Sequence, residues 1–341
     1  MHPISARLRH RAGIVCTGLL LVSIASLLIA GLTGSVAIPL ADLPGALHEL
    51  FDGRPETLAA TLLDLRASRA LTAFVTGATL SLAGVMMQTL LRNPLADPYV
   101  LGISAGSAVG ALTALMFMCA AWMVDVAAFA GAVVVSMLLY WLARRDMRGG
   151  SAAEGGTALL LLTGTILSSA CVALITLMLS IAPESRLRSM VFWMIGDLSG
   201  APLRWLPWLV LLAGLVFALR AARAMNVLAL HAEAASTLGI RVGPLRKGLF
   251  FCSGLLTAGA VSTAGSIGFV GLIVPHACRF AFGPDHRVLI PAATLAGGAY
   301  LVLADTLART VIAPQQLPVG VVTALIGTPV FLYQLHRLRK S

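Results

Sequence analysis

Long apolar runs separated by short polar segments dominate the sequence. The run from Ala70 to Leu91 contains no charged residue, and at 1.5 Å per residue a helix of this length crosses about 30 Å of hydrocarbon. Further runs of the same kind predict an all-α membrane protein with about ten transmembrane helices. We place these helices at about 13–33, 67–91, 99–118, 123–143, 157–181, 203–222, 248–264, 267–282, 288–309 and 318–336.

The connections between these runs differ in charge. The segment from Gly34 to Asp64 carries mostly acidic residues, whereas Arg and Lys concentrate in alternate connections. Basic connections are retained in the cytoplasm, so we expect both termini to be cytoplasmic and 34–64 to lie outside. A second outer segment, 183–201, contains an apolar stretch at 190–195 that predicts a short helix along the surface. The longest inner connection is 223–247.

The basic start of the chain has two interpretations. Arg7, Arg9 and Arg11 precede the first apolar run, an order that also occurs in secretory signal peptides. The run is longer than the apolar region of a usual signal peptide, so we favour a retained first helix.

Composition agrees with a membrane protein. Hydrophobic residues make up 58% of the 341 residues and charged residues only 11%, against about 25% charged in soluble proteins. We therefore expect one transmembrane domain over 1–341 and no soluble catalytic domain. The net charge of +10 would suggest nucleic acid in a soluble protein, but the inner connections account for it. The five cysteines are scattered singly, which argues against a disulfide framework or a thiolate metal site.

Small residues recur every fourth position on both sides of a polar elbow, Arg92 to Pro98. This spacing lets neighbouring helix backbones approach closely, and its simplest interpretation is packing within one subunit. Two prolines in the elbow break the helix. The small residues are Ala73, Gly77 and Ser81 before the elbow, and Gly102, Gly106 and Gly110 after it.

The elbow and its flanks resemble the FecCD family, the permease subunits of ATP-binding-cassette importers. The pattern R-x-x-R, G-A-x-L-x-x-x-G, Q-x-x-x-R-N-P-L-A-x-P and L-G-x-x-x-G is met at Arg66, Arg69, Gly77, Ala78, Leu80, Gly84, Gln88, 92–96, Pro98, Leu101, Gly102 and Gly106. Two more family blocks match 268–279 with 283–287, and 304–309 with 317–331.

The resemblance implies a type II importer permease fold in the bacterial inner membrane. The chain would work as a homodimer with two ATP-binding subunits and a periplasmic substrate-binding protein. Its cargo would be an iron-siderophore, haem or cobalamin-type chelate, and Phe192 to Leu198 is slightly closer to the cobalamin type. The sequence contains no G-x-x-x-x-G-K-[ST] phosphate loop. ATP and Mg would therefore bind the partner, and this chain would be no enzyme and bind no cofactor.

The resemblance also implies contact residues. The segment with Glu233, Ala234, Ala235, Leu238 and Gly239 is similar to the coupling helix that docks on the ATPase subunit, although such a motif also occurs in ordinary interfacial turns. Matching family arginines accept acidic residues of the binding protein, which would assign docking to Arg66, Arg69 and Arg309. The alternative is an internal pair, because Asp305 lies four residues before Arg309.

A cytoplasmic gate is implied at the elbow residues Asn93 and Leu95 together with Gly156, Thr157 and Ala158. Family members carry serines where this chain has Gly156 and Ala158, so steric closure by Leu95 is the simpler mechanism here. The same family comparison places Gly102, Gly106 and Gly110 near the transport pathway.

Three other interpretations compete with the importer. Pro275, His276 and Arg279 suggest a metal or acid/base site, but a structural bridge is simpler because no carboxylate completes a ligand set. An ion-driven secondary transporter would need intramembrane carboxylates, of which Asp305 is the nearest example. A membrane enzyme would need convergent catalytic groups, and the sequence offers none.

Overall fold

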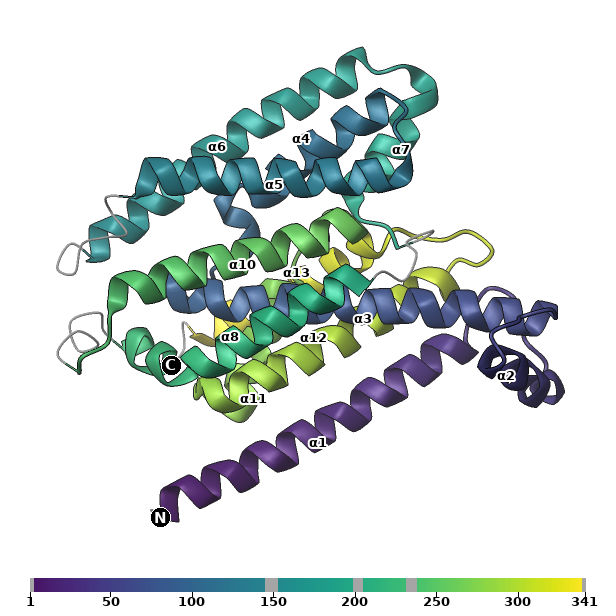
Figure 1. Ribbon diagram of the computed structural model, residues 1–341, viewed down its shortest axis with the longest axis horizontal. Coiled ribbons are helices and arrows are strands. Elements are labelled where there is room, and N and C mark those ends of the chain that lie inside the picture. Colours follow the sequence, from purple (N-terminus) through teal and green to yellow (C-terminus); the bar gives the residue numbers. More distant parts are fainter. Residues whose placement is uncertain (1–2, 145–152, 199–204, 231–237, 339–341) are drawn as a thin grey trace.

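The computed structural model describes residues 3–144, 153–198, 205–230 and 238–338. Within these ranges every regular element is helical (Figure 1). Ten of the described α-helices correspond to the predicted spans: α1 (Pro3–Leu32), α3 (Leu58–Leu90), α4 (Ile103–Met116), α5 (Ala121–Ala143), α6 (Ala153–Ile181), α8 (Trp205–Leu230), α10 (Val242–Ala264), α11 (Val270–Phe282), α12 (His286–Thr310) and α13 (Val319–Leu338).

The other described elements are short. They are the α-helices α2 (Leu43–Phe51) and α7 (Glu184–Ile195) and the 3₁₀ helices η1 (Leu40–Asp42) and η2 (Pro98–Leu101). Among the described helices, six are long and apolar enough to cross a membrane, namely α1, α3, α5, α6, α8 and α12, and shorter apolar helices accompany them.

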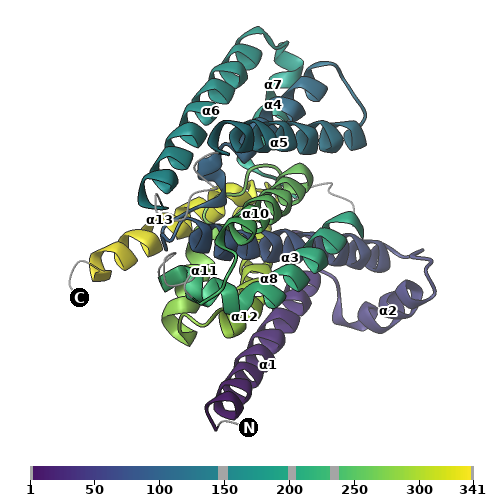
Figure 2. The same cartoon turned by 60° about the vertical axis from the view of Figure 1, so that its left-hand side comes forward.

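Helix α3 forms the centre of the molecule. It runs between α8, α10 and α12, while α4, α5, α6 and α7 form a layer on one side and α1 lies along the opposite edge in both views (Figures 1 and 2). In the most apolar stretch of α3, 89% of the residues are buried, against 11% in α1. The uncharged stretch of α3 therefore belongs to the protein core, whereas α1 is mostly exposed, as expected of a helix that faces lipid.

Glycines set the closest helix contacts. A Cβ atom on Gly77 would meet the carbonyl oxygen of Gly297 in α12, and one on Gly84 would meet the carbonyl oxygen of Gly271 in α11. In the peripheral layer, a Cβ on Gly110 of α4 would meet the carbonyl oxygen of Ala127 in α5. The four-residue spacing of small residues thus brings helix backbones together in two separate places.

Several element boundaries differ from the prediction. Helix α3 begins at Leu58 rather than 67, because the Thr57 hydroxyl caps it by accepting from the Ala60 N–H at 3.2 Å. Glu49 of α2 holds this cap in place, accepting from the Thr57 N–H at 2.9 Å. The segment 34–64, expected to be a connection, therefore contains η1, α2 and the start of α3.

The inner connection 223–247 and the outer segment 183–201 also contain more helix than predicted. Helix α8 continues to Leu230 and α10 begins at Val242, so helical structure enters the loop from both sides. Helix α7 begins at Glu184, and its Met190 is fully buried among residues of α4, α5 and α6. It therefore packs into the peripheral layer and does not simply lie on the surface.

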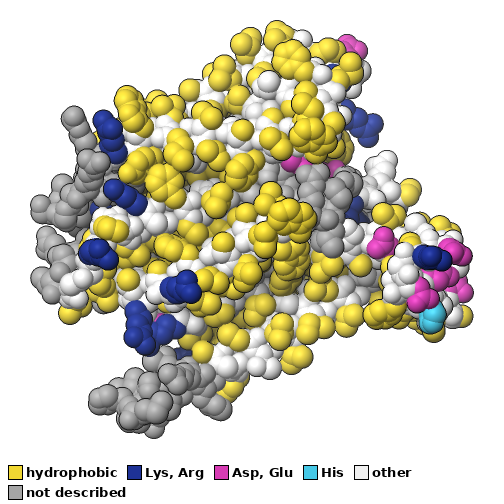
Figure 3. Space-filling view, viewed as in Figure 1, with side chains coloured by type: hydrophobic (Ala, Val, Ile, Leu, Met, Phe, Trp, Pro, Cys, Tyr) yellow, Lys and Arg dark blue, Asp and Glu magenta, His cyan; other side chains and the backbone are white. Residues whose placement is uncertain are grey.

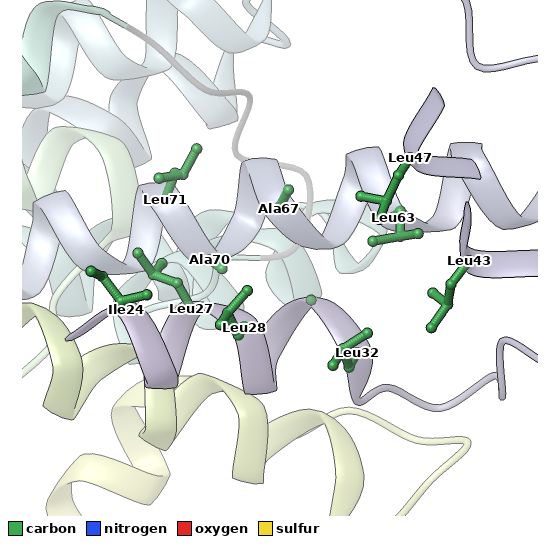
Figure 4. A pocket seen from close by; sticks show the side chains of 11 residues that line it. Ile24, Leu27, Leu28, Leu32, Leu43, Leu47, Leu63, Ala67, Ala70 and Leu71 are labelled. Atoms are coloured by element: carbon green, nitrogen blue, oxygen red, sulfur yellow. The ribbon is translucent and has the colours of Figure 1, made fainter. Parts of the chain in front are cut away.

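An apolar groove of about 580 Å³ separates α1 from α3 near α2. Leucines dominate its wall, with Leu28 and Leu32 from α1, Leu63 and Leu71 from α3, and Leu47 from α2 (Figure 4). The groove therefore lies beside a helix that is mostly exposed along its apolar stretch.

Candidate functional site

The three predicted docking arginines meet at one end of the molecule, around Asp305 of α12. Arg69 donates from Nε and Nη2 to the Asp305 carboxylate at 2.8–3.1 Å, and its Nη1 donates to Gln316 Oε1 at 2.9 Å. Arg309 Nε lies 3.1 Å from Asp305 Oδ2. One buried carboxylate therefore pairs with two guanidinium groups, and Arg69 of α3 contacts both α12 and, through Gln316, the loop after α12.

Arg66 and Arg309 also cap α1. Arg66 Nη1 donates to the Leu32 carbonyl at 3.2 Å and its Nη2 donates to the Val36 carbonyl. Arg309 Nη2 donates to the Ala30 carbonyl at 3.3 Å. The last carbonyls of a helix have no partner within it, so positive groups here satisfy them and interact favourably with the helix dipole. We define Arg66, Arg69, Arg309 and Asp305 as the outer cluster.

The three arginines of the outer cluster differ in how much of their surface a partner protein could contact. Arg66 is 6% exposed and Arg309 is 5% exposed, whereas the Arg69 side chain keeps 12% of its surface. The internal pair weighed as the alternative from sequence is formed by Arg309 and Asp305. Docking of a binding protein on these arginines stays a prediction, and in this arrangement only the edge of Arg69 is open to it.

The elbow is built from local hydrogen bonds. The Asn93 and Arg92 N–H groups donate to the Gln88 and Thr89 carbonyls at 3.1 and 3.3 Å, a pattern that ends helices by a left-handed residue. That residue is Arg92, with φ +49°. Asn93 Oδ1 accepts from the Leu95 N–H at 2.9 Å, so the two predicted gate residues belong to one turn. Asn93 is exposed and Leu95 half-buried.

Side-chain hydrogen bonds of Asp97 and Tyr99 hold the end of the elbow in place. Asp97 Oδ1 accepts from the Tyr99 N–H at 2.8 Å and caps η2. The Tyr99 hydroxyl donates to the Ile267 carbonyl at 2.9 Å and accepts from the Ile267 N–H at 3.2 Å. Burial raises the pKa of the Asp97 carboxyl to about 6, which the hydrogen bond from Tyr99 opposes.

The second half of the predicted gate lies at the start of α6. Gly156, Thr157 and Ala158 all fall within this helix, and Ala158 is exposed. The elbow approaches α6 further along the helix, where Gly164 faces the Cα of Leu101. Gly102 follows with φ +80° and lies beside Ser168 of α6. Gating between the elbow and 156–158 stays a prediction.

The glycines predicted to lie near the pathway line the contact between α4 and its neighbours. Gly106 faces Gly131 and Val135 of α5, and Gly110 faces Ala127 of the same helix. Gly102 faces α6 instead. Their close packing follows from the spacing, whereas a position beside a transport pathway stays a prediction.

Only part of the predicted coupling motif can be described. Glu233, Ala234 and Ala235 lie outside the described residues. Leu238 and Gly239 form a turn in which Leu238 is 69% exposed and Gly239 has φ +77° with open space around its Cα. An exposed leucine beside a left-handed glycine suits a protein contact, but coupling stays a prediction.

Arg279 forms the structural bridge expected from sequence. Its Nη1 donates to Gln88 Oε1 at 3.0 Å, and Gln88 Nε2 donates to the Leu272 carbonyl at 3.2 Å. Nearby, Asn226 Oδ1 accepts from the His286 N–H at 2.8 Å, and Asn226 Nδ2 donates to Asp285 Oδ1 at 2.8 Å. The contacts of Asn226, which sequence reasoning did not identify, join α8 to the start of α12, and the Arg279 bridge joins α11 to α3 at the same end.

Comparisons with known proteins agree on one family. The model of the FecCD transport family matches residues 19–337. The cobalamin import system permease protein BtuC of Halobacterium salinarum is 41% identical over 83% of this chain and 75% of its own length. The hemin transport system permease protein HmuU of Yersinia pestis is 38% identical over 82% of this chain and 84% of its own.

A solved structure gives the same fold. An inward-facing conformation of a transporter assigned to the metal-chelate type of ABC transporters has a TM-score of 0.79 and 29% sequence identity to this chain. The match covers 95% of this chain and 99% of that one.

Proposed function

Because the chain belongs to the FecCD transport family, we propose that it is the membrane permease subunit of an importer for a metal-chelate type cargo. The observation that carries this proposal is the family match over 19–337, which includes the elbow and the outer cluster. The cargo class is an iron-siderophore, haem or cobalamin-type chelate, in keeping with the cobalamin and hemin transport named for the relatives.

The energy source lies on another chain. No phosphate loop occurs in the sequence, so two separate ATPase subunits bind ATP and Mg and dock on the turn at Leu238 and Gly239. The permease works as two copies that enclose the pathway between them, and the whole of 1–341 acts as one transmembrane domain. A periplasmic binding protein delivers the cargo.

The charge distribution supports one orientation in the membrane. Most of the visible Lys and Arg side chains lie at the left in Figure 3, where α3 ends, and Asp and Glu gather at the right around α2. Both termini also lie on the left in Figure 1. Since basic residues favour the cytoplasm, we place the elbow end and both termini in the cytoplasm of a bacterial cell and the outer cluster at the periplasmic face.

This orientation assigns roles to the two ends. At the periplasmic end, the binding protein meets the exposed edge of Arg69, while Arg66 and Arg309 hold α1 and α12 in the shape that it recognises. At the cytoplasmic end, Leu95 in the elbow turn closes the pathway sterically against the start of α6.

The alternative of an ion-driven secondary transporter is less consistent with the contacts of Asp305. An ion-coupling carboxylate must exchange a proton or cation during transport, whereas Asp305 is 1% exposed and bound by both Arg69 and Arg309. Its charge is already compensated in the described structure.

The deciding experiment is co-expression of the chain with its genomic neighbours, followed by an ATPase assay in liposomes. Candidate corrinoid, haem and siderophore ligands are loaded on the binding protein. We expect a complex of two permeases and two ATPase subunits, stimulated by one loaded binding protein. A chain that purifies alone and transports along an ion gradient without ATP would overturn the proposal.

A further inference from the structure

A pocket of about 490 Å³ opens at the elbow end, between α3, α8, α11 and α12. Much of its wall is apolar, but two arginines and one carboxylate also line it. The polar and charged residues among its lining include Arg92, Arg279, Asp285, His286, Gln88 and Asn226. None of these side chains has a part in the transport mechanism proposed above, beyond the bridge between Gln88 and Arg279.

The pocket carries more positive than negative charge, because two arginines, Arg92 and Arg279, and one carboxylate, Asp285, line it. The carboxylate at the wall, Asp285, is already engaged by Asn226 Nδ2 at 2.8 Å and by the Arg287 N–H at 3.0 Å. Arg246 of α10 is 4% exposed, and burial, followed by the charge of Arg92, lowers the pKa of its guanidinium. An anion stabilises two cations that repel each other in this way.

Unused hydrogen-bond donors point to the same conclusion. Among the described residues, Nε of Arg92 and both Nε and Nη2 of Arg246 are buried without an acceptor. Buried polar groups are satisfied in most proteins, and an exception indicates a missing water, ion or ligand. Since the donors are cationic, an anion satisfies them better than water does.

The backbone of Arg92 gives an independent indication. Arg92 occupies the left-handed position at the end of α3, with φ +49°, where glycine is the usual residue. A non-glycine residue in this conformation is strained, and such strain is concentrated at functional sites. Arg92 lines the pocket, so the residue in this conformation contributes a guanidinium group that a glycine would lack.

We propose that this pocket binds a phosphate group, either free phosphate or the phosphate of a lipid headgroup. Arg92 and Arg279 contact it directly, because planar guanidinium groups bind phosphate in a bidentate manner. Gln88 orients Arg279 through the 3.0 Å hydrogen bond, and the positive charge of Arg246 adds to that of Arg92. The start of α12 also borders the pocket, but the Asp285 carboxylate already caps this helix by accepting from the Arg287 N–H at 3.0 Å. The two arginines therefore supply the anion contacts.

The location of the site links it to the gate. Arg92 immediately precedes Asn93, so a phosphate held between Arg92 and Arg279 fixes the elbow turn to α11. The cytoplasmic location of this site and its effect on a gate rest on the proposed function. Phosphate binding to the pocket does not depend on the proposed function.

The test uses the full-length permease without its ATPase subunits, since these bind phosphate themselves. Equilibrium dialysis with radiolabelled inorganic phosphate at constant ionic strength measures free-phosphate binding to delipidated protein. Native mass spectrometry of gently purified protein detects a retained phospholipid. The variants are R92Q, R279Q and, as a matched control at the same end of the molecule, R144Q, because Arg144 is exposed at the end of α5.

If free phosphate is the ligand, dialysis shows saturable binding that R92Q and R279Q each weaken at least tenfold and R144Q leaves unchanged. If a lipid is the ligand, the same pattern appears in the mass of the bound phospholipid while dialysis shows no binding. The proposal fails if neither assay detects a ligand, if the signal survives both variants, or if R144Q removes it equally.

Two additions keep the test decisive. R92K and R279K retain the charge but lose the planar fork, so we expect binding weaker than in wild type but stronger than in the glutamine variants. The decrease relative to wild type can be measured even if R92Q or R279Q does not fold, and unchanged binding in both lysine variants would then overturn the proposal. Loss of ATPase subunit co-purification in the variants, with phosphate and lipid binding unchanged, would show that the arginines receive an acidic protein segment and would overturn the proposal. Because that assay is separate from transport, the site and the proposed function can fail independently.

Discussion

Arg69 and Asp305 form a bidentate ion pair, with nitrogen to oxygen distances of 2.8–3.1 Å, between positions 236 residues apart. Asp305 also pairs with Arg309. The carboxylate is 1% exposed, so its removal leaves two guanidinium groups without a counter-charge in a nearly dry site.

We therefore expect Asp305→Asn to destabilise the protein by about 3–5 kcal/mol, the usual cost of breaking a buried ion pair on one side. The unfolding midpoint of the purified protein in detergent, followed by intrinsic fluorescence, measures this. Asp64→Asn is the matched control, because Asp64 is an exposed carboxylate on α3, and we expect a change below about 0.5 kcal/mol there. Equal midpoints for Asp305→Asn and wild type would contradict the structural role.

Gly84 is a second sensitive position. A methyl group there would meet the carbonyl oxygen of Gly271 in α11, and overpacking of this kind costs about 1–3 kcal/mol or more. Gly84→Ala should reduce the yield of monodisperse protein in size-exclusion chromatography. Gly259→Ala in α10 serves as the control, since its methyl would lie 3.5 Å from Val210 Cγ1, an ordinary contact. Similar profiles for both variants would argue against close α3–α11 packing.

Substitutions in the Leu238–Gly239 turn can test coupling to the ATPase subunit without disturbing the packed core. Gly239 and Gly243 both have open space at Cα, but only Gly239 has a positive φ, of +77°. A valine at Gly239 is strained by about 1–2 kcal/mol and should distort the turn that we propose contacts the ATPase subunit. Gly239→Val should thus lower stimulated ATPase activity severalfold in reconstituted complexes, whereas Gly243→Val should not. Full coupling in Gly239→Val would remove the proposed role of this turn.

The elbow should show a pH dependence through Asp97. Burial raises its pKa to about 6 from 3.8, so the folded state favours the protonated carboxyl. The free energy of unfolding then falls as the pH rises from about 4 through 6 and stays low above that.

Asp97→Asn removes this loss while it keeps an oxygen to accept from the Tyr99 N–H. We expect the variant to be more stable than wild type at pH 8 by at most about 3 kcal/mol, at about 1.4 kcal/mol per pKa unit, and to match it near pH 4. Unfolding midpoints across this range measure the difference. A constant difference at every pH would show that the substitution acts through packing and not through ionisation.

The features that the sequence predicted correctly are those that depend on the local pattern of residues. Apolar runs located ten helices, although α1, α3 and α8 extend well beyond their predicted bounds. The spacing of Gly77, Gly106 and Gly110 indicated close packing that the helix contacts display. The boundary at Leu58 was missed because Asp64, Arg66 and Arg69 interrupt the hydropathy of α3. The cap at Thr57 depends on Glu49 of a separate helix, which no local pattern reports.

The outer cluster shows where pattern reasoning ends. An arginine at the mouth of a membrane helix can face outward to a partner or inward to carbonyls, and the sequence is the same in both cases. Arg66 turns toward the end of α1, and Arg309 toward Ala30 and Asp305. These choices are made by tertiary contacts between distant segments, as is the meeting of Arg92 and Arg279 at one pocket.

The capping of α1 by Arg309 has a consequence for biosynthesis. The two partners, Ala30 and Arg309, are 279 residues apart, so α1 receives this cap only after α12 has been translated. Until then Arg66 of α3, which lies 34 residues beyond Leu32, is the guanidinium available to the final carbonyls of α1. The contact between α1 and α12 therefore forms late in synthesis, whereas the contact between α1 and α3 can form early.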